Sequence, residues 1–216
     1  MIPKIIHCFW AGGPKTKLAR KCRASWERFA PEWEIREFQL PSALPAFVRE
    51  AVAARKWAMV SDWVRMRALH DEGGVYLDYD VELVAPIERL PAGEWVASEW
   101  KAGGGTWLNP GSGIALEKGS EIARHMLERY DRLAFDPKRE MMAWINESLG
   151  GAEGLAVLEP EVMSPIGTDG SLRRTGRTVG IHRYAMSDAS AGRKLARWLS
   201  WHGLNGVVKL LLRLKK

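Results

Sequence analysis

The chain has 216 residues, of which 46% are hydrophobic and 27% charged, and this suits one globular domain with one sizeable core. Its net charge of +6 is uneven, because residues 172–216 carry eleven Lys or Arg and one acid, whereas the remainder carries a net charge of −4. This distribution, with no zinc-finger, helix-turn-helix or RNA-binding signature, argues against nucleic acid as a partner.

The chain also lacks the sequence features of an exported or membrane-spanning protein. No early stretch has the layout of a signal peptide, and no apolar run reaches the roughly 20 residues needed to span a bilayer. Cys8 and Cys22 have neither a CxxC nor a Cys/His spacing, so we interpret both as reduced core thiols. We therefore predict a cytoplasmic protein.

Strand and helix patterns alternate along the sequence. In chain order, the patterns predict a strand at 4–10, a helix at 18–29, a strand at 33–38, helices at 46–55 and 59–72, strands at 75–77 and 94–100, a Gly-rich loop at 101–113, a strand from 114, helices at 120–133 and 138–149, and a strand at 155–160. This alternation predicts an α/β fold with a mainly parallel sheet flanked by helices.

The stretch GGVYLDYDVEL (73–83) contains two acidic residues directly after an apolar strand. In an extended segment, Asp78 and Asp80 would point to the same side. Two adjacent carboxylates repel each other unless a positive charge lies between them. One interpretation is a turn with solvated aspartates. The other is a site for a hard divalent cation such as Mg²⁺ or Mn²⁺, which prefers carboxylate oxygens and bridges them to phosphates.

The block SDWVRMRALHDEGGVYLDYDVEL (61–83) resembles the defining motif of the glycosyltransferase family 32 type. These are DXD-containing sugar transferases related to yeast mannosyltransferases, bacterial capsule and lipopolysaccharide enzymes, and the glucosylating clostridial toxins. The matching positions are Ser61, Asp62, Arg65, Gly73, Gly74, Tyr76, Asp78 and Asp80. The opening IPKIIHCFWAGG (2–13) also resembles the family's first strand and loop.

This resemblance implies a glycosyltransferase-A-like, Rossmann-type fold, which we place at residues 1–192. It implies a nucleotide-sugar donor such as a UDP- or GDP-hexose, a divalent metal (Mn²⁺ or Mg²⁺), and transfer with retention at the anomeric carbon. The acceptor would be a saccharide or a lipid-linked oligosaccharide, as in polysaccharide, capsule or lipopolysaccharide biosynthesis.

The resemblance also implies roles for individual residues. Asp80 would bind the metal directly, and Asp78 would contact the donor's ribose or sugar and also touch the metal. Asp62 and Arg65, with Ser61 beside them, would grip the transferred sugar, and Arg65 would reach the diphosphate. The alternative for Asp62 and Arg65 is an exposed helical ion pair with no role in chemistry.

Three further residues are candidates at this site. Trp10 lies where the family stacks an aromatic ring on the nucleotide base, although it could also be a core tryptophan. His182 resembles the late histidine that binds the metal, and Ser187 and Asp188 are fallback ligands. Asn109 would contact the donor sugar, or would build a tight Asn-Pro-Gly turn.

The C-terminal segment 193–216 mixes Leu, Val and Trp with Lys and Arg. Basic amphipathic helices bind anionic membrane surfaces, which would place the protein peripherally at the inner membrane face. A terminal helix packed on the core with a solvated basic face is the alternative.

Two other functions remain to be weighed. A haloacid-dehalogenase-type phosphatase also places Asp-x-Asp at a strand end, but Glu82 occupies the position of its usual hydroxyl residue and no later Gly-Asp-x-x-x-Asp follows. A non-catalytic, basic membrane-surface adaptor would need neither metal nor nucleotide sugar.

Overall fold

The computed structural model describes residues 1–11, 13–101 and 103–185. The fallback ligands Ser187 and Asp188 and the basic segment 193–216 lie outside the described residues, as does the domain boundary placed at residue 192. That boundary remains a prediction. Within the described residues, no helix combines the length and the apolar character needed to cross a bilayer.

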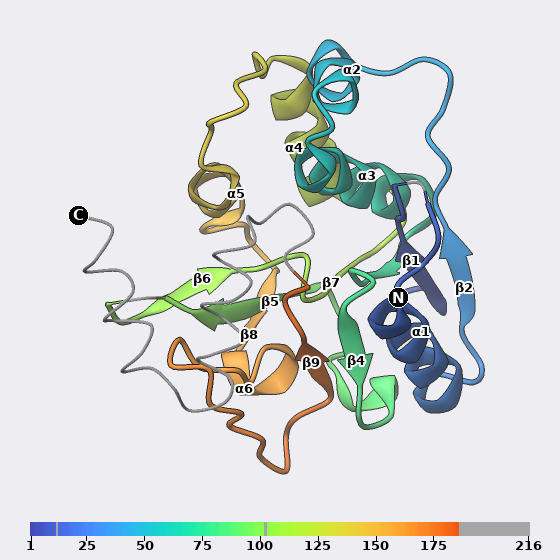
Figure 1. Cartoon of the computed structure of the whole chain (residues 1–216), viewed down its shortest axis with the longest axis vertical. Coiled ribbons are helices and arrows are strands. Elements are labelled where there is room, and N and C mark those ends of the chain that lie inside the picture. The colour runs from blue at the N-terminus through green and yellow to red at the C-terminus, as the bar shows by residue number, and fades with distance from the viewer. Residues whose placement is uncertain (12, 102, 186–216) are drawn as a thin grey trace.

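Strands and helices follow the predicted alternation closely (Figure 1). The strands are β1 (Ile5–Cys8), β2 (Glu34–Glu37), β3 (Gly74–Tyr76), β4 (Val81–Leu83), β5 (Trp95–Trp100), β6 (Thr106–Leu108), β7 (Ile114–Leu116), β8 (Ala156–Leu158) and β9 (Gly180–His182). The helices are α1 (Lys17–Phe29), α2 (Ala46–Ala53), α3 (Trp57–Glu72), the 3-10 turn η1 (Ile87–Arg89), α4 (Glu121–Asp131), α5 (Met141–Leu149) and α6 (Pro160–Met163). The Gly-rich segment 101–113, predicted as a loop, contains strand β6.

Among the described residues, seven strands form one sheet, in which β2, β1, β3, β7 and β5 are successive neighbours and both β6 and β8 also pair with β5. The α/β class with flanking helices is confirmed. Strand directions are more mixed than the predicted mainly parallel sheet, with three parallel and three antiparallel pairs among these described strands. A short connection joins β5 to β6 and makes this pair antiparallel, and β7 continues along β5 in the direction of β6.

β6 and β7 run along the same edge of β5, and residues 109–113 loop out between them. Ala97 of β5 accepts a hydrogen bond from Asn109 N and donates one to Gly113 O, each at 2.8 Å. In antiparallel pairing both groups of one residue face the same neighbour, so the two strands share this edge. The outward loop lies at the carboxyl end of β3.

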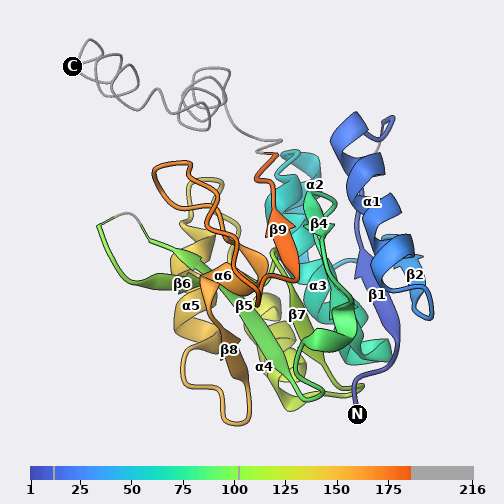
Figure 2. The ribbon, with the colours of Figure 1, turned by 90° about the horizontal axis from the view of Figure 1, so that it is seen from below.

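The two faces of the sheet bury separate apolar clusters. In β3, Val75 packs with Leu77 on the face covered by α1 and α6, whereas Tyr76 faces the side covered by α2, α3, α4 and α5. Figures 1 and 2 show these helices on opposite sides of the sheet. This alternation follows the two-residue period of a strand.

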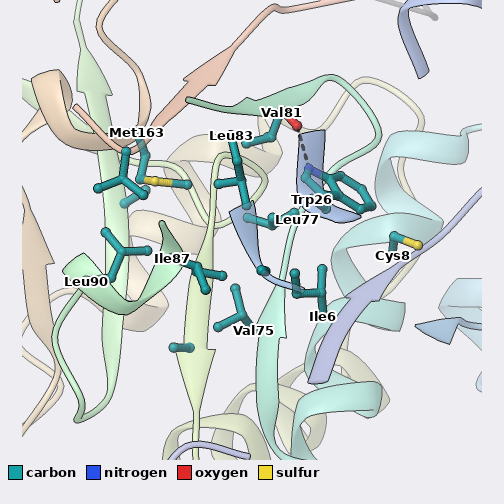
Figure 3. Close-up of a cluster of buried hydrophobic side chains, with 14 of the residues drawn as sticks. Ile6, Cys8, Trp26, Val75, Leu77, Val81, Leu83, Ile87, Leu90 and Met163 are labelled. Carbon is teal, nitrogen blue, oxygen red and sulfur yellow. Dashed lines mark hydrogen bonds between the residues drawn. The ribbon is translucent and has the colours of Figure 1, made fainter. Parts of the chain in front are cut away.

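Helix α1 fixes the start of β4, the strand that follows the two aspartates. Trp26 is fully buried, and its indole Nε1 donates to the carbonyl of Val81 at 2.7 Å (Figure 3). Leu77, Val81 and Leu83 belong to the same cluster. The backbone on both sides of the acidic turn is therefore anchored in the core.

Candidate active site

Two glycines bring the acidic turn into place beside β1. Gly73 ends α3 with φ 68°, and Gly74 begins β3 with φ 113°. Residues other than glycine rarely adopt these backbone angles. A Cβ on Gly74 would lie 2.6 Å from the carbonyl oxygen of Ile5. The glycine pair therefore lets helix α3 pass directly into a strand that packs tightly against β1.

Asp78 and Asp80 lie in a turn and not in the extended segment that we predicted. Val81 N donates to Asp78 O at 3.0 Å and closes this turn before β4 begins. β4 then pairs with β9 so that Val81 lies opposite His182. Pairing of the two short strands, which are distant in sequence, thus brings a histidine to the two aspartates.

Among the described residues, Asp78, Asp80 and His182 form the one cluster with the character of a cation site. Each offers one ligand atom, and these atoms all lie within 4.8 Å of one another. The Nε2 atom of His182 lies 3.3 Å from Asp80 Oδ1, and Ala185 N donates to Asp80 Oδ2 at 2.6 Å. The structure therefore brings together the three residues that were predicted as metal ligands.

The three side chains perturb one another's pKa values. Burial raises the pKa of Asp78, in spite of the Arg65 guanidinium beside it. Burial would also raise the pKa of Asp80, but nearby His182 outweighs this and lowers it. Burial would lower the pKa of His182, yet the Asp80 carboxylate raises it overall. His182 and Asp80 thus each favour the charged form of the other.

Arg65 is the positive partner of Asp78. Its side chain is 3% exposed, with Nη1 2.9 Å from Asp62 Oδ1 and Nη2 3.4 Å from Asp78 Oδ1. The guanidinium also lies over the Tyr76 ring, 4.8 Å from its centroid. Ser61 Oγ lies 2.9 Å from Tyr76 Oη and donates to Asp78 Oδ1 at 3.3 Å. The alternative of an exposed ion pair is wrong, because the pair is buried against the acidic turn.

Asn109 is 8% exposed and builds the loop between β6 and β7. Its Oδ1 accepts from Gly111 N at 3.0 Å and from Ser112 N at 3.3 Å, as in an Asx turn. Its Nδ2 donates to Glu99 Oε2 at 2.7 Å. The turn interpretation is therefore confirmed, and contact with a donor sugar stays a prediction.

Trp10 lies next to the acidic turn, at the end of β1. Its ring packs edge-on against Tyr79, the residue between the two aspartates, with centroids 5.4 Å apart. Its Nε1 donates to Gly13 O at 3.1 Å. Trp10 is half-buried against the core, and stacking on a nucleotide base stays a prediction.

Sequence reasoning missed three residues of this site. The backbone of Gly111 accepts a hydrogen bond from Asp78 N at 3.0 Å. Ser112 Oγ lies 2.8 Å from His182 Nδ1, and Ser164 Oγ donates to Ser112 Oγ at 2.7 Å. The small residues of NPGSG hint at close packing there. No local pattern distinguishes Ser164.

Comparison with known proteins identifies the class of this site. Residues 18–97 match the family model of the glycosyltransferase sugar-binding region containing the DXD motif. This stretch holds α1 except for its first residue, α3 and the acidic turn. The resemblance to DXD-containing sugar transferases is thus confirmed over these residues. No curated protein sequence matches the chain at a significant level.

Solved structures show the fold. The PaToxG glycosyltransferase is similar over 68% of this chain and 69% of its own, with a TM-score of 0.54 and 20% identity. A glycosyltransferase involved in glycosylation of the major capsid of PBCV-1 is similar over 85% and 95%, with a TM-score of 0.50 and 14% identity. At these identities the likeness concerns the fold alone, which is of the glycosyltransferase-A type.

Proposed function

We propose that the protein is a metal-dependent, retaining glycosyltransferase that moves a hexose from a UDP- or GDP-sugar to a saccharide or lipid-linked acceptor. The observation that carries this proposal is the cluster of Asp78, Asp80 and His182, whose ligand atoms lie within 4.8 Å of one another. The DXD-type region and the fold support the transferase class.

The chemistry of the three side chains fits a divalent cation. Two carboxylates suit Mg²⁺ or Mn²⁺, and the imidazole favours Mn²⁺, because Mg²⁺ is held almost wholly by oxygen atoms. A cation bound there would act as a Lewis acid toward the diphosphate leaving group. In this proposal Asp80 and His182 hold the cation, and Asp78 faces both the cation and the donor.

The remaining residues bind and orient the donor. Arg65 and Ser61 hold Asp78 Oδ1 and so fix the orientation of the Asp78 carboxylate beside the proposed cation site. Asp62, next to Arg65, would accept hydrogen bonds from hydroxyls of the transferred sugar. Trp10 would stack on the base. Front-face attack by the acceptor and double displacement both fit retention, and no covalent nucleophile is assigned.

The decisive experiment is a panel of UDP-, GDP- and CDP-sugars, with donor hydrolysis and transfer measured in Mn²⁺ and in excess chelator. We expect turnover in the presence of Mn²⁺ and none in excess chelator. Mn²⁺ at one hundred times its dissociation constant should raise the free energy of unfolding by about 2.7 kcal/mol. Full turnover in chelator would contradict metal dependence.

Substitution of Asp80 provides the matched test. Asp80→Asn should abolish both turnover and stabilisation by Mn²⁺, because it removes a ligand charge while keeping the shape of the side chain. Asp71→Asn is the control, since Asp71 is a half-exposed aspartate of α3 paired with Arg67 at 2.7 Å. Equal Mn²⁺ stabilisation in both variants would refute the assignment of Asp80.

The same panel, with a phosphomonoester added, separates the alternatives. A phosphatase would hydrolyse phosphomonoesters and leave nucleotide sugars intact, but the match of residues 18–97 to a sugar-transferase model argues against it. A non-catalytic adaptor would gain no stability from Mn²⁺ or from any donor. A cytoplasmic location, peripheral at the inner membrane face, completes the proposal and depends on the basic segment 193–216.

A further inference from the structure

The Nδ1 side of the His182 ring contacts the buried Ser112, and Ser112 in turn contacts the buried Ser164. Ser112 Oγ lies 2.8 Å from His182 Nδ1, and Ser164 Oγ donates to Ser112 Oγ at 2.7 Å. Both serines are fully buried, and His182 is 8% exposed. The serines come from the loop after β6 and from the residue after α6, so three distant segments meet at this ring.

A histidine can bind a metal through Nε2 only when that nitrogen carries no proton, and the proton must then be on Nδ1. A group that accepts a hydrogen bond from Nδ1–H fixes this tautomer and the orientation of the ring. Ser112 Oγ is placed to be that acceptor. Ser164 donates to the same oxygen and so holds Ser112 Oγ in place beside Nδ1.

A second neighbour of Nδ1 favours the opposite tautomer. The Nδ2 atom of Asn109 lies 3.5 Å from His182 Nδ1. This nitrogen is a donor, because Oδ1 of the same amide accepts from two backbone N–H groups and fixes the amide orientation. At 3.5 Å it competes weakly with Ser112 at 2.8 Å. Without Ser112, however, it would favour the tautomer whose Nε2 is protonated and cannot bind a metal.

We infer that Ser112 and Ser164 are positioning residues that hold His182 in the orientation and tautomer required for metal binding. This inference rests on the proposed function, since it assumes that His182 is a ligand. A positioning role can be told apart from a packing role, because Ser164 can then affect metal binding only through its contact with Ser112.

The test measures Mn²⁺ affinity of the metal-free full chain by isothermal calorimetry, without any donor. Ser112→Ala should weaken Mn²⁺ binding by about 10- to 100-fold, the usual effect of removing the partner of a metal-bound histidine. Ser164→Ala should weaken it less. The double variant should bind as Ser112→Ala alone does, because residues acting in series are not additive.

Ser98→Ala is the matched control. Ser98 is 2% exposed, and its hydroxyl donates to the Leu158 carbonyl at 2.6 Å and not to His182. It should retain the wild-type Mn²⁺ affinity. A second readout is the ¹⁵N spectrum of the Mg²⁺-loaded protein, in which the His182 signals should show Nδ1–H in the wild type and lose this signature in Ser112→Ala.

The outcomes are distinct. If the wild type binds Mn²⁺ and Ser112→Ala binds it equally well, the positioning role is overturned and the metal site stands. If the losses in Ser112→Ala and Ser164→Ala add fully in the double variant, the serial arrangement is overturned. If the wild type binds no Mn²⁺, the proposed metal site fails and the positioning role fails with it.

Discussion

Arg65 neutralises the acidic end of β3 from inside the protein. It is 2% exposed, and it bridges Asp62 and Asp78 while its guanidinium covers the Tyr76 ring. A buried charge that loses its partner costs far more than an exposed one, because it keeps its desolvation penalty without compensation. Arg65 therefore affects the stability of the whole chain as well as the orientation of Asp78.

We predict that Arg65→Met lowers the free energy of unfolding by about 3–5 kcal/mol, because it leaves two partly buried carboxylates uncompensated. Denaturant unfolding in the absence of metal measures this effect. Arg67→Met is the control on the same helix, since Arg67 pairs with Asp71 at 46% and 36% side-chain exposure. It should cost less than about 1 kcal/mol. Similar losses in both variants would contradict a special role for Arg65.

Gly111 leaves the space that the Asp78 carboxylate occupies. A Cβ at this position would lie 2.4 Å from Asp78 Oδ2 and 3.3 Å from Arg65 Nη2. We predict that Gly111→Ala displaces Asp78, weakens Mn²⁺ binding, and destabilises the protein by about 1–3 kcal/mol through overpacking.

Gly93→Ala is the control for Gly111→Ala, because a Cβ at Gly93 would meet no atom within 4 Å. Calorimetric titration with Mn²⁺ and denaturant unfolding compare the two variants. Unchanged Mn²⁺ affinity in Gly111→Ala would mean that the Asp78 carboxylate tolerates the shift.

At the scale of elements, α1 and β4 form a unit that supports the acidic turn. The indole of Trp26 donates to Val81 O, and the Ser25 hydroxyl accepts from Leu83 N at 2.9 Å. Two consecutive residues of the helix therefore bond to both ends of the strand. This arrangement fixes the chain that leaves Asp80.

We predict that Trp26→Phe costs about 2 kcal/mol or more, because it leaves the buried Val81 carbonyl without its donor and removes apolar contacts. Trp33→Phe is the control, since the indole of Trp33 donates to the exposed Glu88 carboxylate at 2.8 Å. Thermal and denaturant unfolding should show the larger loss for Trp26→Phe. The reverse order would contradict the anchoring role of α1.

Local patterns in the sequence were sufficient to predict most elements. They were not sufficient to predict which distant strands pair. The apolar spacing of Leu18, Cys22 and Trp26 predicted α1, and Gly73 marked the end of α3. β4 and β9 have three residues each, and nothing local indicates that they pair. The late histidine was found only through family resemblance.

The site residues that the sequence did not predict also depend on contacts between distant parts of the chain. Ser112 and Ser164 matter because they meet in space, 52 residues apart in sequence, and a lone buried serine has no periodic signal. The direction of β7 likewise depends on its insertion between β3 and β5. Such features result from tertiary packing and cannot be read from propensity.

The whole molecule combines a mildly acidic body with a basic C-terminal part. Residues 193–216 contain seven Lys or Arg and no acid. If this segment docks on anionic lipid, each basic residue near the surface contributes about 1 kcal/mol, and added salt weakens the binding.

We predict that the full chain co-sediments with vesicles containing phosphatidylserine and not with neutral phosphatidylcholine vesicles. Replacing Lys209, Arg213 and Lys215 by Glu should abolish this binding while leaving donor hydrolysis unchanged. Exposed Lys17, Arg20 and Lys138 provide the control, since their replacement by Glu changes net charge equally. Equal loss in both triple variants would indicate non-specific attraction to the basic protein.

The pairing of β4 with β9 also has a consequence for synthesis of the chain. The bond between Asp80 and Ala185 joins residues 105 positions apart, and β4–β9 pairing closes a loop of similar length. Closing so long a loop is entropically costly and depends on prior folding of the intervening sheet. A nascent chain that has left the ribosome only as far as β8 already displays both aspartates but lacks the histidine. The proposed ligand set is therefore completed late in folding, and a chain that ends before β9 cannot assemble it.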